Sequence, residues 1–379
     1  MRTHTRPRRM TWLGTSFAAT SLLIASCSGD FGGEAAAGDD EGGGEETAQD
    51  SGEPELSPPP EIDCEVLDGD DLAEHTIKFG IGLAEDSPQG RAVQYFGDYL
   101  SECTDGRLTV DLFPDSQVGD DLEMMSGLRS GTLEMTYPST SPAVSFVPEL
   151  GVFDLPFLVP DTDAADRIFD SEVGDEMLAE FEGSGMLALA WGENGFRQVT
   201  NNDGPIESPE DVQGLDVRVM ENEIQVTIWE QLGANPTTMA FGEVFSALEQ
   251  GVVSGQENPW VTNYTSNFWE VQDYGSETRH VYTPFLFMIG EEFYNGLDPA
   301  YQDLIQEASD ATSEYQRQVA REMDSWARDQ FEASGAEVNV LDEDQLDAFR
   351  EATAPVYDRW APQIGEELID EVRSVAEGE

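Results

Sequence analysis

The chain has 379 residues and carries 78 acidic side chains against 18 basic ones, a formal net charge of −60 at pH 7. Such an excess of anions excludes a protein that grips the phosphates of nucleic acid, which requires clustered cations. It also argues against electrostatic docking on an anionic membrane. Hydrophobic residues make up 39% of the chain, enough for a packed core, so we expect one large domain or two medium ones.

The first 26 residues have the pattern of an export signal. A stretch with arginines at positions 2, 6, 8 and 9 precedes an uncharged apolar segment that is too short to span a membrane. The end of this segment, Ile24-Ala25-Ser26-Cys27, resembles a bacterial lipobox, in which the cysteine is lipidated. We therefore expect an extracytoplasmic protein anchored to the cell membrane through Cys27. An ordinary cleaved signal with an incidental cysteine is the alternative. Loss of the four arginines and of no acid gives a mature charge of −64.

Residues 27–61 have the composition of an acidic tether. After Cys27 this segment contains eleven acids, eight glycines and four prolines, with no basic residue and no apolar periodicity. Mutual repulsion of the acids favours an extended, solvated chain. We expect the folded part to begin near Ile62.

Two further cysteines, Cys64 and Cys103, remain after the lipobox. Outside the cytoplasm an even pair of cysteines favours a disulfide. Two buried thiols are the alternative, because Cys103 falls on the apolar face of a predicted helix.

From Thr76 onward, strand and helix periodicities alternate, which favours an α/β fold with mostly parallel sheets. Strands are predicted at residues 76–83, 108–113, 133–137, 186–191, 215–219 and 282–289. Helices are predicted at residues 90–104, 120–128, 163–181, 222–232 and 242–250, with a further helix start at Ser208.

One predicted helix is longer than a single domain is wide. It begins at Asp298-Pro299 and ends at Gly335, which corresponds to roughly 50 Å of helix. Its apolar stripe is too irregular for a coiled coil and too polar to span a membrane. A helix of this length most naturally lies across two domains. Shorter packing helices are predicted at residues 344–353 and 361–376.

The sequence contains no arrangement typical of an enzyme. Two histidines follow the signal, His75 and His280, and neither has the spacing of a metal ligand. No nucleophile elbow, phosphate-binding loop or complete dinucleotide fingerprint occurs, and the acidic clusters lack the ligand spacing of a calcium loop. We expect no enzymatic activity, no cofactor and no metal ion.

Two arginines in apolar surroundings require a partner. Arg218 lies within the predicted strand 215–219, and Arg197 lies in a turn after the predicted strand 186–191. A guanidinium keeps its charge when it is buried, and its planar fork matches a carboxylate. The partner is either an acid of the protein or an anionic ligand, and the ends of strands are where open α/β sheets bind ligands.

Eight short motifs occur in order along the chain: FPDSQVGDD at 113–121, FDLPF at 153–157, NGFRQ at 194–198, GLDVRV at 214–219, LGANP at 232–236, MAFGEVFSAL at 239–248, GQENP at 255–259 and EVQ at 270–272. Together they resemble the solute receptors of tripartite ATP-independent periplasmic (TRAP) transporters, the DctP family. The resemblance extends from about Thr76 to the end of the chain.

This resemblance implies an α/β, two-lobed, periplasmic-binding-protein-like fold with a cleft at the hinge and a long helix crossing both lobes. Lobe I is expected to comprise residues 62–194 with about 284–323. Lobe II is expected to comprise residues 195–283 with about 324–379.

The resemblance also implies that the cleft binds an organic anion. The implied contacts are Arg218 as the carboxylate clamp, Arg197 as a second cation, Asn258 as a polar contact, Phe241 as an apolar wall, and Ser139 and Ser87 from lobe I. Glu221, three residues after the clamp, is placed either to accept hydrogen bonds from a ligand hydroxyl or ammonium or to lie on the surface.

The function implied by the resemblance is capture of an organic acid and its delivery to the small and large TRAP membrane subunits. A dicarboxylate, a sugar acid and a zwitterionic compatible solute all fit, whereas the uncharged stretch Ser139–Pro142 argues against sialic acid. One alternative is a receptor for an ABC importer or a sensor kinase. A second alternative is a secreted, lipid-anchored hydrolase.

Overall fold

The computed structural model describes residues 54, 56–67 and 72–378, which all belong to one compact unit, Ser51–Glu379. The predicted export signal, Cys27 and the part of the tether up to residue 53 lie outside the described residues. In the described part of the chain, none of the helices combines the length and the apolar character needed to cross a membrane.

The first of two sheets has five strands in the order β2-β1-β3-β10-β4. Its strands are β1 (His75–Gly80), β2 (Leu108–Phe113), β3 (Met135–Thr136), β4 (Met186–Phe196) and β10 (Tyr282–Gly290). Side chains alternate between the faces of β10: Phe285, Phe287 and Ile289 enter one core, and Leu286 and Met288 enter another. The sheet is therefore buried on both faces, which explains its continuous apolar runs.

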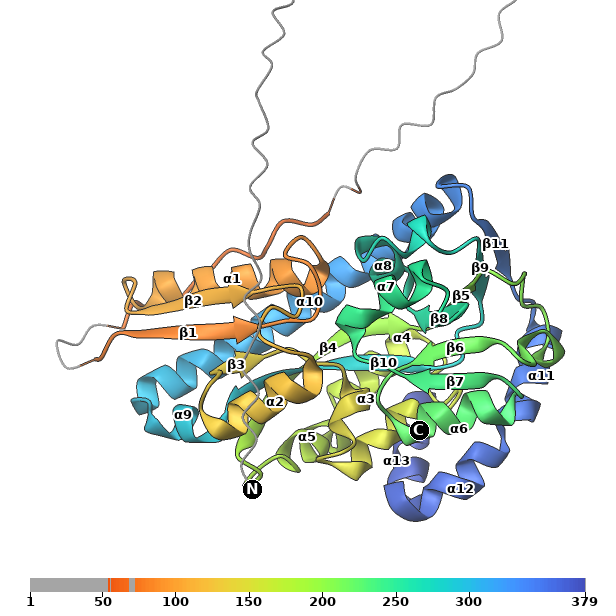
Figure 1. The fold of residues 1–379 in the computed structure, drawn as a ribbon. Coiled ribbons are helices and arrows are strands. Elements are labelled where there is room, and N and C mark those ends of the chain that lie inside the picture. The colour runs from red at the N-terminus through yellow and green to blue at the C-terminus, as the bar shows by residue number, and fades with distance from the viewer. Residues whose placement is uncertain (1–53, 55, 68–71, 379) are drawn as a thin grey trace, which may run out of the picture. The chain divides into compact units, whose positions relative to one another are not determined.

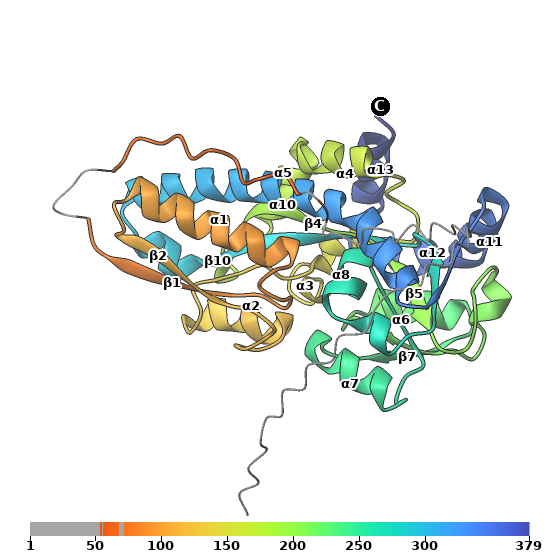
Figure 2. The ribbon, with the colours of Figure 1, turned by 90° about the horizontal axis from the view of Figure 1, so that it is seen from above.

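Helices cover both faces of this sheet (Figures 1 and 2). On one face, α1 (Pro88–Cys103) packs beside α10 (Pro299–Ala333). The ring of Phe287 from β10 lies 4.9 Å from Phe96 of α1 and 5.2 Å from Phe79 of β1, measured between centroids. The opposite face carries α2 (Asp121–Ser130) and α9 (Glu291–Gly296).

The second sheet has six short strands in the order β11-β9-β5-β8-β6-β7. They are β5 (Gln198–Asn201), β6 (Asp216–Val219), β7 (Asn235–Thr238), β8 (Gly255–Asn258), β9 (Tyr274–Glu277) and β11 (Glu337–Val340). Both sheets are mixed: among the described residues five strand pairings are parallel and four are antiparallel, so the predicted parallel arrangement holds for only part of each sheet. The chain crosses between the sheets along β4 and β5 and returns along β9 and β10, so outgoing and returning strands lie side by side in opposite directions.

The remaining helices are short. They are α3 (Thr140–Ala143), α4 (Thr162–Phe169), α5 (Glu172–Ala179), α6 (Glu223–Gln231), α7 (Val244–Glu249), α8 (Trp260–Thr265), α11 (Glu343–Thr353), α12 (Pro355–Ile364) and α13 (Glu366–Glu377), with 3-10 turns at Pro148–Asp154, Pro209–Val212, Phe241–Glu243 and Phe268–Glu270. Two predicted helices are each divided. The predicted helix 163–181 is divided into α4 and α5, because the Ser171 hydroxyl accepts from the Gly174 N–H and caps a new helix start. The predicted helix 361–376 is divided at Gly365, whose φ of 108° separates α12 from α13.

The long helix α10 has 35 residues and contacts elements of both sheets. Asp298 caps its start by accepting from the Ala300 N–H at 3.0 Å, and it ends before Gly335 at φ 108°. It packs on α1 and β4 and then on α8 and β11. The predicted two-lobed α/β fold with a helix crossing both lobes is thus confirmed, while the residue boundaries assigned to the lobes stay a prediction.

An N-terminal strap, residues 56–67, packs against the first lobe. Leu56, Ile62 and Leu67 contact its core. The backbone N–H and the hydroxyl of Ser57 donate to the carboxylate of Glu322 on α10, at 2.7 and 2.6 Å. Packing therefore begins before Ile62, within the segment expected to be a solvated tether.

A disulfide fixes the other end of this strap. It joins Cys64 to Cys103 at the end of α1, with Cα atoms 5.9 Å apart and a sequence separation of 39.

Replacing both cysteines, C64S with C103S, should lower the free energy of unfolding by about 2–4 kcal/mol, because the open chain gains entropy mainly in the unfolded state. Denaturant unfolding of both proteins measures this difference. A reductant should destabilise the wild type and leave the double variant unaffected. An unchanged unfolding midpoint in the variant would contradict the prediction.

Candidate functional site

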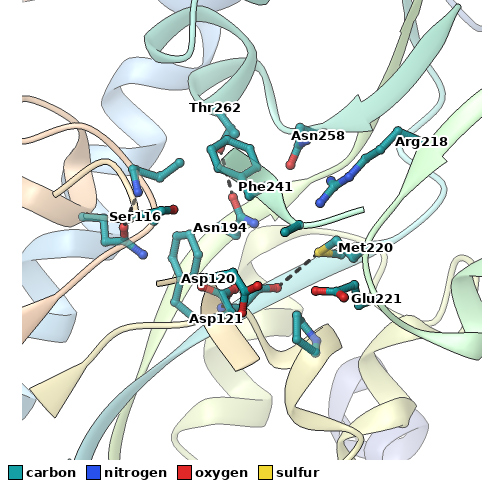
Figure 3. A pocket seen from close by; sticks show the side chains of 17 residues that line it. Ser116, Asp120, Asp121, Asn194, Arg218, Met220, Glu221, Phe241, Asn258 and Thr262 are labelled. Carbon is teal, nitrogen blue, oxygen red and sulfur yellow. Dashed lines mark hydrogen bonds between the residues drawn. The ribbon is translucent and has the colours of Figure 1, made fainter. Parts of the chain in front are cut away.

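A pocket lies where the carboxyl ends of strands from both sheets face each other (Figure 3). About 570 Å³ of space in this region is free of atoms, a volume that includes open solvent. Its lining consists of Gly82, Leu83, Gln89, Ser116, Asp120, Asp121, Ser139, Pro142, Asn194, Arg218, Met220, Glu221, Ala240, Phe241, Asn258, Thr262 and Phe285. Most of these residues lie on or just after the last residue of a strand, where α/β sheets commonly bind ligands.

Arg218 is the cation of this pocket. It lies in β6, only 2% of it is exposed, and its head points into the pocket (Figure 3). Its Nε and Nη2 atoms donate to the carbonyl oxygen of Met239, at 3.0 and 2.6 Å. Its Nη1 atom has no hydrogen-bond partner among the described residues. Burial lowers the pKa of Arg218 to about 10, so the guanidinium remains charged at neutral pH with one nitrogen left for a ligand.

Three carboxylates line the same pocket. Asp120 caps α2 through the Glu123 N–H at 2.8 Å. Next to it, Asp121 accepts from the Ser139 N–H at 3.1 Å, and desolvation raises its pKa to about 7. The pKa of Glu221 is raised by desolvation and then by the charge of Asp120. These acids do not amount to a metal site: no group of three metal-binding side chains occurs in the described part of the chain.

Neutral side chains complete the walls. Thr262 donates to the Asn194 amide oxygen at 3.1 Å. Gln89 is held by the Tyr137 carbonyl at 2.6 Å and by the Leu83 N–H at 3.2 Å. Apolar surface comes from Met220, Phe241 and Phe285. The pocket therefore combines polar groups with apolar surface around a single buried cation.

Arg197 does not line the pocket but lies directly behind it. It is fully buried, and its Nε and Nη2 atoms bond the carboxylate of Glu257. Nη2 also donates to the side-chain oxygen of Asn258 at 3.0 Å, and His280 Nε2 lies 3.3 Å from the Glu257 carboxylate. Burial alone would raise the pKa of Glu257, but Arg197 and His280 hold it at about 2. Arg197 thus has a protein partner, one of the two possibilities left open by the sequence, and its contact with a ligand stays a prediction.

Ser87, the other residue expected at the site, caps α1 instead. Its hydroxyl accepts from the Gly90 N–H at 3.1 Å and donates to the Ala84 carbonyl at 2.6 Å. Both hydrogen-bonding roles of this hydroxyl are therefore used within the first lobe. The other five predicted residues, namely Arg218, Asn258, Phe241, Ser139 and Glu221, are brought together in the pocket lining.

Sequence reasoning missed Asp121 and Asn194. Both lie within motifs that carried the family resemblance, at 113–121 and 194–198. Neither residue type stands out in this composition, since acids are abundant along the whole chain. For Asn194 the signal is its position three residues after the predicted strand 186–191, whereas Asp121 lies in the predicted helix 120–128 and has no such signal.

Comparison with known proteins identifies relatives over most of the chain. Residues 79–363 match the family model described as bacterial extracellular solute-binding protein, family 7 (DctP). The 2,3-diketo-L-gulonate-binding periplasmic protein of Escherichia coli K12 is 34% identical over 80% of this chain and 93% of its own length.

Solved structures show the same fold. The sugar acid binding protein of Advenella mimigardefordensis in complex with galactonate is 36% identical, with a TM-score of 0.80 over 81% of this chain and 99% of its own. A TRAP solute binding protein of Sulfurospirillum deleyianum with bound succinate is 32% identical, with a TM-score of 0.77 over 80% of this chain and 100% of its own.

Replacing Glu257 by Gln should lower the free energy of unfolding by about 3–5 kcal/mol, because Arg197 then remains buried without a counter-charge. Chemical denaturation at neutral pH measures the loss. Asp347→Asn, in an exposed ion pair with Arg350, serves as the control and should cost no more than about 1 kcal/mol. Equal losses in the free energy of unfolding for the two variants would contradict the prediction that the buried pair stabilises the fold more than an exposed one.

Proposed function

Because the chain belongs to the bacterial extracellular solute-binding proteins of family 7, the DctP family of TRAP receptors, we propose that its pocket captures a small organic carboxylate through Arg218. The chain is an extracytoplasmic solute receptor by family and by fold. This family assignment favours a TRAP transporter over an ABC importer or a sensor kinase, and no observation favours the hydrolase alternative.

The observation that carries the proposal is that Nη1 of Arg218 has no hydrogen-bond partner in the part of the chain that the structure describes. A buried guanidinium nitrogen without an acceptor is costly, and a ligand carboxylate would supply that acceptor. The Met239 carbonyl holds the other edge of the guanidinium, so the planar group is already oriented before a ligand arrives. Asn258 adds an amide at the same wall, and Arg197, itself paired with Glu257, holds the oxygen of that amide in place.

Binding would couple to closure of the lobes. Arg218 and Asn258 belong to the second sheet, whereas Asp121 and Ser139 follow strands of the first. A ligand that contacts both walls favours the closed state by its additional contacts there, and expulsion of water strengthens each charged hydrogen bond. Delivery to the small and large membrane subunits is the role that family membership gives to the closed form.

Two further parts of the proposal concern ligand and location. The relatives bind sugar acids or a dicarboxylate by their names, so both classes are candidates here. We further propose that Cys27 carries a lipid that anchors the protein to the outside of the cell membrane. The basis is the lipobox-like sequence before Cys27.

Replacing Arg218 by Ala should weaken carboxylate binding by at least about 100-fold, because the buried charge-assisted bonds are lost. A thermal-shift screen with galactonate, 2,3-diketogulonate, erythronate and succinate first finds the ligand, which raises the melting temperature as its concentration exceeds its Kd. Calorimetry then compares the wild type with the variant.

Two more variants make this test specific. Arg218→Lys keeps the charge without the planar fork and should bind with intermediate affinity. Arg373→Ala removes an exposed arginine paired with Asp370 and should bind like the wild type. Wild-type affinity in a folded Arg218→Ala protein would refute the proposed clamp.

A further inference from the structure

Asp154 is a buried carboxylate that plays no part in the pocket described above. It ends the 3-10 turn Pro148–Asp154 and belongs to the motif at 153–157, none of whose residues lines the pocket. Only 1% of the residue is exposed. Burial raises its pKa to about 6, so the carboxylate is mostly charged at pH 7.5. A charge held in the interior requires hydrogen-bond donors, and the side chains found to donate to Asp154 are all neutral.

Two of the three side chains found to donate to Asp154 in the described part of the chain belong to the second lobe. The Ser141 hydroxyl of α3, in the same lobe as Asp154, donates to Oδ1. Asn222 donates to Oδ2 and Gln225 to Oδ1, each at 2.8 Å. Asn222 and Gln225 begin α6, which follows β6 of the second sheet, whereas Asp154 lies between β3 and β4 of the first. The carboxylate is therefore shared between the lobes.

The start of α6 is arranged to donate to this carboxylate. The side-chain oxygen of Asn222 caps the helix by accepting from the Ile224 N–H at 2.7 Å. Its amide nitrogen then donates both to Asp154 and, at 2.9 Å, to the Ser141 carbonyl. Gln225 is fully buried, and its side-chain oxygen has no hydrogen-bond partner among the described residues, so its polar end serves Asp154. The positive end of the helix dipole adds to the attraction.

A glycine lets α6 come this close to the first lobe. A Cβ atom placed at Gly151, in the same 3-10 turn as Asp154, would lie 2.6 Å from Cδ1 of Ile224. Any larger residue would therefore push α6 away from the turn. Because the two segments belong to different sheets, the distances of 2.8 Å from Asn222 and Gln225 to the carboxylate depend on how the lobes are placed relative to each other.

The shared carboxylate lies directly behind two walls of the pocket. Ser139 and Pro142 line the pocket from the first lobe, and Met220 and Glu221, which immediately precede Asn222, line it from the second. The Ser139 hydroxyl lies 3.6 Å from Sδ of Met220, so the walls meet here (Figure 3). Bending of the strands that join the sheets would alter both the width of the pocket and the contacts behind it.

We propose that Asp154 is a positioning residue of the receptor, whose carboxylate holds Asn222 and Gln225 of the second lobe when the lobes are closed and so latches the cleft around a bound solute. This inference rests on the proposed function and concerns the regulation of the same site. The latch, defined by these three side chains, touches no ligand. It raises ligand affinity because its cross-lobe hydrogen bonds favour the closed state over the open one.

Exchanging two of these side chains across the interface tests the latch. In Asp154→Asn, Oδ1 can still accept from Ser141 and Gln225, but the new amide nitrogen at the place of Oδ2 meets the donating amide of Asn222. In Asn222→Asp, two buried carboxylates face each other. When both changes are made, the amide introduced at position 154 donates to the carboxylate introduced at position 222, which can still cap α6.

Calorimetry at pH 7.5 with galactonate, erythronate and succinate measures the effect on affinity. Each single variant should bind the best of these ligands at least about tenfold more weakly than the wild type, because a hydrogen bond to a charged group is lost. The double variant should bind more tightly than either single variant, since compensation of this kind arises only between interacting side chains. Asp358→Asn, the same change on an exposed residue of α12, is the matched control and should bind like the wild type.

A milder variant and a second measurement guard against loss of folding. Gln225→Met nearly conserves volume and removes one donor from the second lobe, so ligand affinity should fall at least about threefold. Chemical denaturation of every variant without ligand shows whether it is folded. The double variant should also have a higher unfolding midpoint than Asn222→Asp.

The outcomes separate the latch from the proposed function. Wild-type affinity in a folded Asp154→Asn or Gln225→Met protein overturns the latch, and so does a double variant that binds no better than the weaker single variant. Compensation in the unfolding midpoint without compensation in affinity would make the network purely structural and also overturns it. The carboxylate receptor is refuted by a different result, namely a wild type that binds no carboxylate or an unchanged affinity in Arg218→Ala.

Discussion

The fold depends on how it accommodates two guanidinium charges that burial cannot remove. Arg197 is neutralised within the protein by Glu257, and this pair ties the turn between β4 and β5 to β8. Among the described residues, the hydrogen bonds of Arg218 go to the neutral carbonyl of Met239 alone. The two arginines therefore have different roles. Arg197 holds the strands together where the chain crosses between the sheets, and Arg218 directs its charge into the pocket.

Much of the first lobe and the long helix could be predicted from the sequence, because their apolar periodicity is strong. The predicted helix from Asp298 to Gly335 is observed at Pro299–Ala333, with its cap and proline as expected. Most of the second sheet could not be predicted. Its strands β7 and β8 read NPTT and GQEN, and such short polar segments become strands through pairing with their neighbours, β7 with β6 and β8 with both β5 and β6.

Site residues of a rare type could be predicted from the sequence, whereas site residues of a common type could not. Arg218 stands out among few cations within an apolar strand. Asp121 is one of 78 acids, and only the fold places it opposite the clamp. Likewise, Glu257, the partner of Arg197, is 60 residues away along the chain, so no local sequence pattern could predict this pair.

The disulfide at the end of the strap determines how the folded part would carry a mechanical load. A pull applied to the chain ahead of Cys64 passes through the covalent bond to Cys103 at the end of α1. The strand β1 and almost all of α1 lie inside the loop that this bond closes, so the force bypasses them. Ahead of the disulfide, the same pull acts on the Ser57–Glu322 contact, and behind it the force enters the first sheet at β2 instead of β1.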